Sequence, residues 1–209
     1  MGFLEIARTG RSETEVKNSR FLGEACAVHS EEEALQRIAG LKKEHYDARH
    51  VCSAYVIRRD EGGVPIVRAS DDGEPQGTAG RPILSVIEGS GLQNCLITVV
   101  RYFGGTLLGT GGLVRAYTQA AQEAVQAAGL SEMTRCAVLL LDMDYGLYNP
   151  VKYYIGEQNL RVEEESFAEK VSILLVVREE AEEKIRAELM ELSAGRIGIE
   201  VCSYGDFAV

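Results

Sequence analysis

Apolar residues follow two different spacings along the chain, and these spacings predict its strands and helices. Short runs rich in β-branched residues, such as 95–100, are typical of buried strands, whereas apolar residues recurring every three or four positions are typical of helices. In the first 130 residues the pattern predicts strands at 21–28, 51–57, 64–69 and 95–100, and helices following Ser30, at 83–88 and at 113–128. Strands followed by helices packed on one side of the sheet indicate an α+β sandwich.

Local signals predict where several of these elements begin and end. Ser30 and Glu33 form a capping box, which marks a helix start. The residues Asp60-Glu61-Gly62-Gly63 separate two predicted strands and are a hairpin signal. Gly129 follows the last apolar position of the longest helix, where glycine commonly ends a helix. We therefore expect residues 129–134 to be a linker between two domains.

The residues after this linker show a second complete pattern. The predicted order is strand 137–143, helix 149–157, strand 161–167, strand 170–177, helix 179–192 and strand 197–204. This β-α-β-β-α-β order is that of a ferredoxin-like fold. We expect residues 1–130 and 135–209 to form separate domains with separate cores.

Two segments of the first domain hold more glycine and charge than a simple connection requires. The acidic segment, residues 70–82, reads SDDGEPQGTAGRP, and turn chemistry explains most of it but not its three clustered carboxylates. The glycine segment, residues 101–113, reads RYFGGTLLGTGGL and places five glycines between a strand and a helix N-terminus. Such an N-terminus is a ready anion site. The alternative is a tight turn that lets the helix pack closely on the sheet.

Neither segment matches a common phosphate, metal or catalytic motif. A Walker A loop needs Lys followed by Ser or Thr after its last glycine, whereas Leu113 follows Gly112. The dinucleotide-binding fingerprint lacks its final glycine, and the spacing of an EF-hand is absent. The sequence also has no G-x-S-x-G or H-E-x-x-H motif. We expect no metal, no cofactor and no catalytic residue set.

Together these segments resemble the IMPACT family, in its bacterial YigZ-like branch. The residues that carry the resemblance are Lys17, Ser19, Arg20, Phe21, 50–55, 70–82, 99–105 and 108–113. The likeness covers about residues 15–130, and the rest resembles the smaller second domain of bacterial members. It implies a first domain akin to ribosomal-protein domains and to domain IV of elongation factor G. It also implies binding to RNA, the ribosome or a translation-regulating protein, with no established enzymatic activity.

The residues expected to bind such a partner lie in or beside the two segments. They are Arg20, His50, Asp71, Asp72, Glu74, Thr78, Arg101, Tyr102, Phe103, Gly104, Gly105, Gly109, Gly111, Gly112 and Arg115. Tyr102 and Phe103 are candidates to stack on bases, with burial at the end of a core strand as the alternative. We also expect the segments to meet, with one of the three carboxylates bonded to Arg101 or Arg115.

Charge narrows the choice of partner and of contact surface. The chain carries −10 in all, with 14 Lys or Arg against 17 Asp or Glu in residues 1–134 and 8 against 15 in residues 135–209. A domain-wide basic footprint for nucleic acid is therefore missing from both domains, and any RNA contact is expected on a local patch of the first, which is nearly balanced in charge. Five scattered cysteines without a C-x-x-C pair are typical of reduced cytoplasmic proteins. No apolar run is long enough to span a membrane.

Two hypotheses about function follow. The first is a non-enzymatic, translation-associated regulatory protein that binds through its first domain. The second is a small-molecule enzyme or phosphate sensor in which the two segments form one pocket, with a divalent ion offsetting the acidic charge. A concave pocket would favour the second hypothesis. A ridge with Arg101 and Arg115 exposed would favour the first.

Overall fold

The computed structural model describes residues 2–59 and 63–208, in which the chain divides into two compact units. One unit spans residues 3–131, and the other is formed mainly by the residues from 132 onward. Each is described below by itself. The predicted hairpin signal at 60–63 lies largely outside the described residues.

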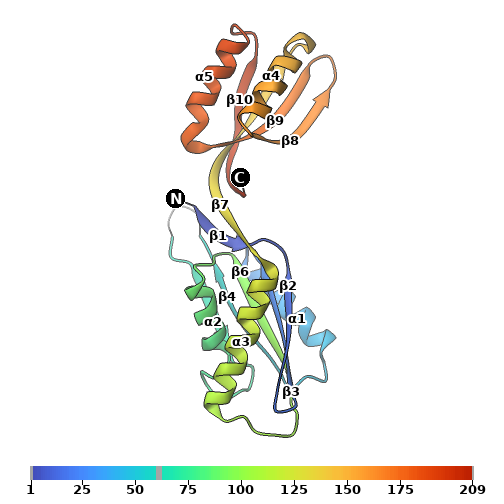
Figure 1. The fold of residues 1–209 in the computed structure, drawn as a ribbon, viewed down its shortest axis with the longest axis vertical. Helices are drawn as coiled ribbons and strands as arrows, with labels where there is room; N and C mark the ends of the chain where they lie inside the picture. Colours follow the sequence, from blue (N-terminus) through green and yellow to red (C-terminus); the bar gives the residue numbers. More distant parts are fainter. Residues whose placement is uncertain (1, 60–62, 209) are drawn as a thin grey trace. The chain divides into compact units, whose positions relative to one another are not determined.

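The first unit is built on an antiparallel sheet with the strand order β2-β3-β6-β4-β5 (Figure 1). Its strands are β2 (Gly10–Val16), β3 (Ser19–Ala27), β4 (His50–Ile57), β5 (Ile66–Ser70) and β6 (Cys95–Tyr102). A short strand, β1 (Phe3–Ile6), is not part of this sheet, and the carbonyl of Leu4 accepts a hydrogen bond from the N–H of Gln93 at 2.9 Å. The central strand β6 pairs with β3 and β4, and Arg101 lies opposite both Phe21 and His50.

Helices cover both faces of this sheet. The helices α2 (Gly80–Gly89) and α3 (Thr110–Ala128) pack on one face against a core that includes Ile97 and Val99. The helix α1 (Glu31–Glu44) packs on the opposite face, where Leu96 is buried. The α+β sandwich is confirmed, but the expectation that the helices lie on one side is wrong. Because β6 is covered on both faces, it is apolar without alternation.

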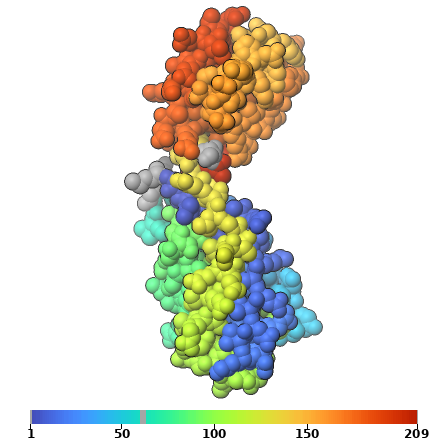
Figure 2. Space-filling model, viewed as in Figure 1, coloured from blue at the N-terminus to red at the C-terminus, as the bar shows by residue number. Residues whose placement is uncertain are grey.

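The ends of the helices follow the local signals. The N–H of Glu33 donates to Ser30 Oγ at 3.1 Å at the start of α1, while the Glu33 carboxylate accepts from the N–H of His29 rather than from Ser30. The helix α3 ends at Gly129, which has a φ of 68°. It begins at Thr110, three residues earlier than predicted, so the last glycines of the glycine segment form its first turn. Figure 2 shows α3 at the surface beside the strands at the start of the chain.

The second unit has the predicted ferredoxin-like fold. Its elements are β7 (Leu130–Met143), α4 (Tyr145–Glu157), β8 (Arg161–Phe167), β9 (Val171–Arg178), α5 (Glu182–Leu192), which follows a 3-10 turn (Glu179–Ala181), and β10 (Gly198–Ala208). Antiparallel pairing gives the strand order β8-β9-β7-β10. The predicted linker at 129–134 is wrong after Gly129, because Thr134 already pairs with Phe207 within the sheet.

Candidate functional site

The acidic and glycine segments meet at one end of the first unit's sheet. His50 is the first residue of β4 and lies opposite Arg101, near the end of β6. This register brings the segment that precedes β4 close to the segment that follows β6. The acidic segment follows β5 and leads into α2, and the glycine segment leads from β6 into α3. The expected meeting of the two segments is therefore confirmed by their contacts, described next.

Asp71 holds the acidic segment in shape. Its carboxylate accepts hydrogen bonds from three backbone N–H groups, those of Gly77 at 2.7 Å, Gly80 at 2.8 Å and Ala79 at 2.9 Å. Partial burial opposes ionisation, but these donors outweigh it and hold the pKa of Asp71 below its ordinary value. The side chain therefore acts as a cap for the turn and for the start of α2.

Asp72 ties the acidic segment to the start of β4. Its carboxylate accepts from the N–H of Val51 at 2.8 Å and pairs with Lys42 of α1. Its backbone carbonyl lies 2.8 Å from His50 Nδ1. Since a carbonyl can only accept, Nδ1 carries the proton, and Nε2 is left on the side of Glu74, 3.9 Å from its Oε1.

Glu74 and Arg101 form a buried ion pair that joins the two segments. Arg101 Nη1 donates to Glu74 Oε1 at 2.5 Å, and the two residues are 4% and 8% exposed. Tyr117 of α3 donates to the same oxygen at 2.8 Å. The expected pairing of a carboxylate with Arg101 is confirmed. Removing one partner of such a pair costs about 3–5 kcal/mol, because it leaves a buried charge uncompensated.

Two further groups belong to the surroundings of this buried pair: the thiol of Cys52, which contacts Tyr117, and the Nε–H of Arg101, which has no acceptor in the described part of the chain. Cys52 Sγ lies 3.4 Å from Tyr117 Oη, and burial raises the pKa of the Cys52 thiol to about 12 despite that contact. Arg101 Nη2 donates to Ser19 Oγ at 3.4 Å. Among the residues that the structure describes, no acceptor lies within hydrogen-bond distance of Arg101 Nε.

A cavity of about 490 Å³ lies between the two segments. Its polar lining residues include Arg49, His50, Glu74 and Arg101, and its apolar lining residues include Phe103, Leu107 and Leu113. The start of α3, at Gly109 and Thr110, also lines it. A volume of this size is typical of small-molecule and cofactor sites. The segments therefore form a concave pocket with Arg101 buried rather than a ridge with Arg101 exposed, which is the outcome that favours the second hypothesis from the sequence.

The structure separates the predicted aromatic pair. Phe103 is 48% exposed, and its ring lies 5.5 Å from the Arg101 guanidinium at the cavity. Tyr102 turns to the opposite face of the sheet, where its hydroxyl lies 2.8 Å from His45 Nδ1 and Arg20 lies 5.7 Å from its ring. Neither residue is part of the core. Tyr102 is the last residue of β6 and points to the face opposite Arg101, because successive residues of a strand point to opposite faces. Phe103 lies beyond the end of the strand.

The remaining predicted residues have different settings. Thr78 is buried, and its hydroxyl donates to the carbonyl of Pro75 at 2.7 Å within the acidic segment. Arg115 is exposed on α3 and does not line the cavity. Gly104 lies against the backbone of Asn18, where an added Cβ would be 2.1 Å from the carbonyl carbon. The turn geometry of the glycine segment explains Gly105 and Gly109, which have φ values of 82° and 72°.

Several residues of the site were not predicted from the sequence. Arg49 directly precedes His50 and lines the cavity. The sequence signal that could have identified it is its position as a cation immediately before a buried strand. Tyr117 lies on the apolar stripe of α3, where its hydroxyl was the only indication of a buried polar partner. Leu107 is 82% exposed at the cavity, a position that the apolar pattern alone does not distinguish from packing.

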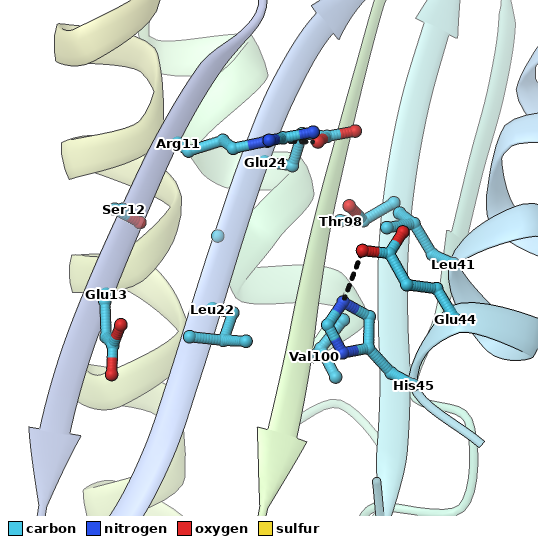
Figure 3. A pocket seen from close by; sticks show the side chains of 11 residues that line it. Arg11, Ser12, Glu13, Leu22, Glu24, Leu41, Glu44, His45, Thr98 and Val100 are labelled. Atoms are coloured by element: carbon cyan, nitrogen blue, oxygen red, sulfur yellow. Dashed lines mark hydrogen bonds and ion pairs between the residues drawn. The ribbon is translucent and has the colours of Figure 1, made fainter. Parts of the chain in front are cut away.

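A second hollow lies on the α1 face of the same sheet, with a volume of about 370 Å³ (Figure 3). Leu22 and Val100 from the strands and Leu41 from α1 line it. Its charged groups already have partners, since Glu24 lies 2.9 Å from Arg11 and 3.2 Å from Arg37. None of the predicted site residues lines this hollow. The cavity between the two segments is therefore the better candidate site.

Comparison with known proteins identifies the family. Residues 17–125, which include both segments, match the model of the Impact N-terminal domain, and residues 141–196 match a domain of unknown function, DUF1949. An IMPACT family member of Haemophilus influenzae is 37% identical over 93% of this chain and 94% of its own length. The chain belongs to the IMPACT family. The IMPACT family member YvyE of Bacillus subtilis is 33% identical over 95% of this chain and 90% of its own length.

The fold of this IMPACT family chain also has a solved counterpart. A crystal structure described as a hypothetical protein superposes with a TM-score of 0.62 at 29% identity, over 97% of this chain and 98% of that one. Within the described residues, no helix is both long and apolar enough to cross a membrane. The same residues contain no group of three or more His, Cys, Asp or Glu side chains placed to hold a metal ion.

Proposed function

We propose that this IMPACT family protein is a cytoplasmic, translation-associated regulator that acts by binding, and that the cavity between the acidic and glycine segments is its binding site. The observation that carries the proposal is the buried Glu74–Arg101 pair, which fixes both segments around a preformed cavity. A site that is already ordered loses less entropy when it binds. The partners expected from the family are RNA, the ribosome or a translation-regulating protein.

The use of the polar groups supports binding rather than catalysis. Asp71 and Asp72 are engaged by backbone donors, and Glu74 is engaged by Arg101 and Tyr117. The nearby thiol of Cys52 stays protonated at neutral pH, because burial raises its pKa to about 12. At the rim, the exposed side chains of Phe103 and Leu107 offer apolar contact to whatever enters.

Association with ribosomes tests this proposal directly. The full chain is sedimented with bacterial ribosomes over a range of salt, alongside the variants Phe103→Ser and Arg49→Gln. Each variant is expected to weaken association by roughly tenfold, since an anchor contact at a binding site contributes about 1–2 kcal/mol. Tyr46→Ser is the matched control, because Tyr46 is 86% exposed in the same unit and does not line the cavity. Association that is absent, or equal in all three variants, would refute the proposal.

The shape of the cavity supports a second candidate function. A concave site of about 490 Å³ fits a small-molecule enzyme or a sensor of a phosphate ligand, which is the second hypothesis from the sequence. The proposed divalent ion is not needed for charge balance there, because the carboxylates already have partners. Saturable small-molecule binding without ribosome association would favour this candidate over the first.

A further inference from the structure

The N-terminus of α3 presents unused backbone donors at the cavity. The first bond of the helix runs from the N–H of Leu113 to the carbonyl of Gly109 at 3.0 Å, so the N–H groups of Thr110, Gly111 and Gly112 have no acceptor within the helix. No side chain caps this end, and the first turn contains no acidic residue. The partial positive charge of the helix end is therefore not offset locally.

Cationic side chains surround the same space. Arg49 is exposed at the cavity, and Arg101 lies in its wall with Nε lacking an acceptor among the described residues. Glu74 is the one carboxylate among the described lining residues, and it already accepts from Arg101 and Tyr117. The site is thus locally positive in a chain whose net charge is −10.

Gly111 is a third and independent indication. An added Cβ at this position would meet no atom within 4 Å, and its backbone φ is not in the left-handed region. The fold therefore requires glycine here neither for close packing nor for a positive φ. Glycine weakens a helix relative to alanine. Its missing side chain leaves the helix end open to close approach by a ligand, as in other phosphate-binding helix ends.

We propose that the ligand group held in this cavity is a phosphate monoester carried on a flat apolar body. This inference rests on the proposed function in using the same site. Three free backbone N–H groups and the exposed guanidinium of Arg49 supply more donors than a carboxylate accepts, whereas the terminal oxygens of a phosphate can accept them. The same cavity is also lined by Phe103, Leu107 and Leu113, which contact the apolar body.

Calorimetric titration of the full chain with phenyl phosphate, inorganic phosphate and benzoate tests the proposal. Phenyl phosphate is expected to bind most tightly, and amide resonances of residues 110–112 are expected to shift. Arg49→Gln is expected to weaken binding about tenfold, and Arg115→Gln, which removes the same charge outside the cavity, less than twofold. Absence of phenyl phosphate binding, or benzoate binding equally well, would overturn the proposal.

A second variant separates ligand binding from folding. Thr110→Asp places a carboxylate at the helix end, where the dipole favours it, so the melting temperature should not fall while phenyl phosphate binding is lost. Thr106→Asp adds the same charge to the glycine segment outside the cavity lining and should retain binding. If Thr110→Asp and Thr106→Asp bind phenyl phosphate equally well, the phosphate does not bind at the N-terminus of α3, and the proposed site is wrong.

Two further titrations distinguish the source of the phosphate and keep this inference apart from the proposed function. A short RNA with a 5′-phosphate is compared with the same RNA bearing a 5′-hydroxyl. Preference for the phosphorylated RNA that disappears in Thr110→Asp supports an RNA end as the ligand, and binding of phenyl phosphate alone supports a small ester. Phosphate binding without ribosome association would sustain this inference and refute the translation-associated function.

Discussion

The buried Glu74–Arg101 pair makes a quantitative prediction about stability. Glu74→Gln keeps the shape of the side chain and one oxygen acceptor but removes the negative charge. Arginine stays charged in proteins, so Arg101 cannot escape the change by losing its proton. Both residues are at least nine-tenths buried, and the guanidinium already has one donor without an acceptor. We expect the variant to lose about 3 kcal/mol, at the lower end of the 3–5 kcal/mol typical of a broken buried pair, because the amide oxygen still accepts.

An exposed pair of the same chemistry is the control. Glu88 lies 3.6 Å from Arg81 on α2, where both side chains are about half exposed or more. Glu88→Gln should cost less than about 1 kcal/mol, as surface ion pairs generally do. The assay is urea denaturation followed by circular dichroism, fitted as two transitions if the two units unfold separately.

A double variant completes the test. Glu74→Leu with Arg101→Met removes both charges together, and it should be more stable than Glu74→Gln, because neither charge is left buried alone. The coupling energy from the full cycle of single and double variants measures the pair itself. Equal losses in Glu74→Gln and Glu88→Gln, or a double variant less stable than either single one, would show that the pair does not hold the segments together.

Three further predictions concern other contacts of the site. Asp71→Asn should lose about 2–3 kcal/mol at pH 7 by urea denaturation, since a charge-assisted acceptor is replaced by an amide. Because the pKa of Asp71 is lower in the folded state, the ionised carboxylate stabilises that state at pH values above the unfolded pKa of about 3.9. This stabilisation is lost as the pH falls through the folded pKa. The difference in stability between Asp71→Asn and wild type should therefore narrow in acid. Iodoacetamide at neutral pH should label the exposed Cys202 but not Cys52, as peptide mass spectrometry will show; equal labelling would contradict the burial of Cys52. Gly104→Ala should lower the melting temperature by several degrees, because its Cβ would lie 2.1 Å from the backbone of Asn18, and an unchanged melting temperature would refute this close approach.

Local patterning was sufficient for most of the fold. The second unit buries one face of its sheet, so its alternating residues indicated strands and helices in their correct order. The strand β2 was missed because its sequence, GRSETEV, is polar. It is held instead by side chains that bond α3, such as Ser12 Oγ donating to the carbonyl of Ala120 at 2.7 Å. The placement of α1 on the second face was also beyond the pattern, because periodicity identifies a buried stripe but not the sheet face that covers it.

The candidate site was predictable where charge was the signal. Three acids and a nearby arginine indicated the contact between the segments, and Glu74 with Arg101 supplies it. The roles of Asp71 and Asp72 depend on backbone N–H groups that converge only in the folded turn, so residue types alone do not reveal them. The separation of Tyr102 from Phe103 follows from the end of β6, a boundary that the sequence places only within a few residues.

The order in which the chain is synthesised gives the Tyr117 contact a consequence of its own. The acidic segment emerges well before α3, yet Tyr117 bonds Glu74 across 43 positions and Cys52 across 65. Contacts between such distant positions form only after the later residue is available. A growing polypeptide that stops short of α3 therefore has the carboxylates and arginines but no cavity. The cavity is therefore complete only after the whole first unit has left the ribosome, and an incomplete chain lacks it.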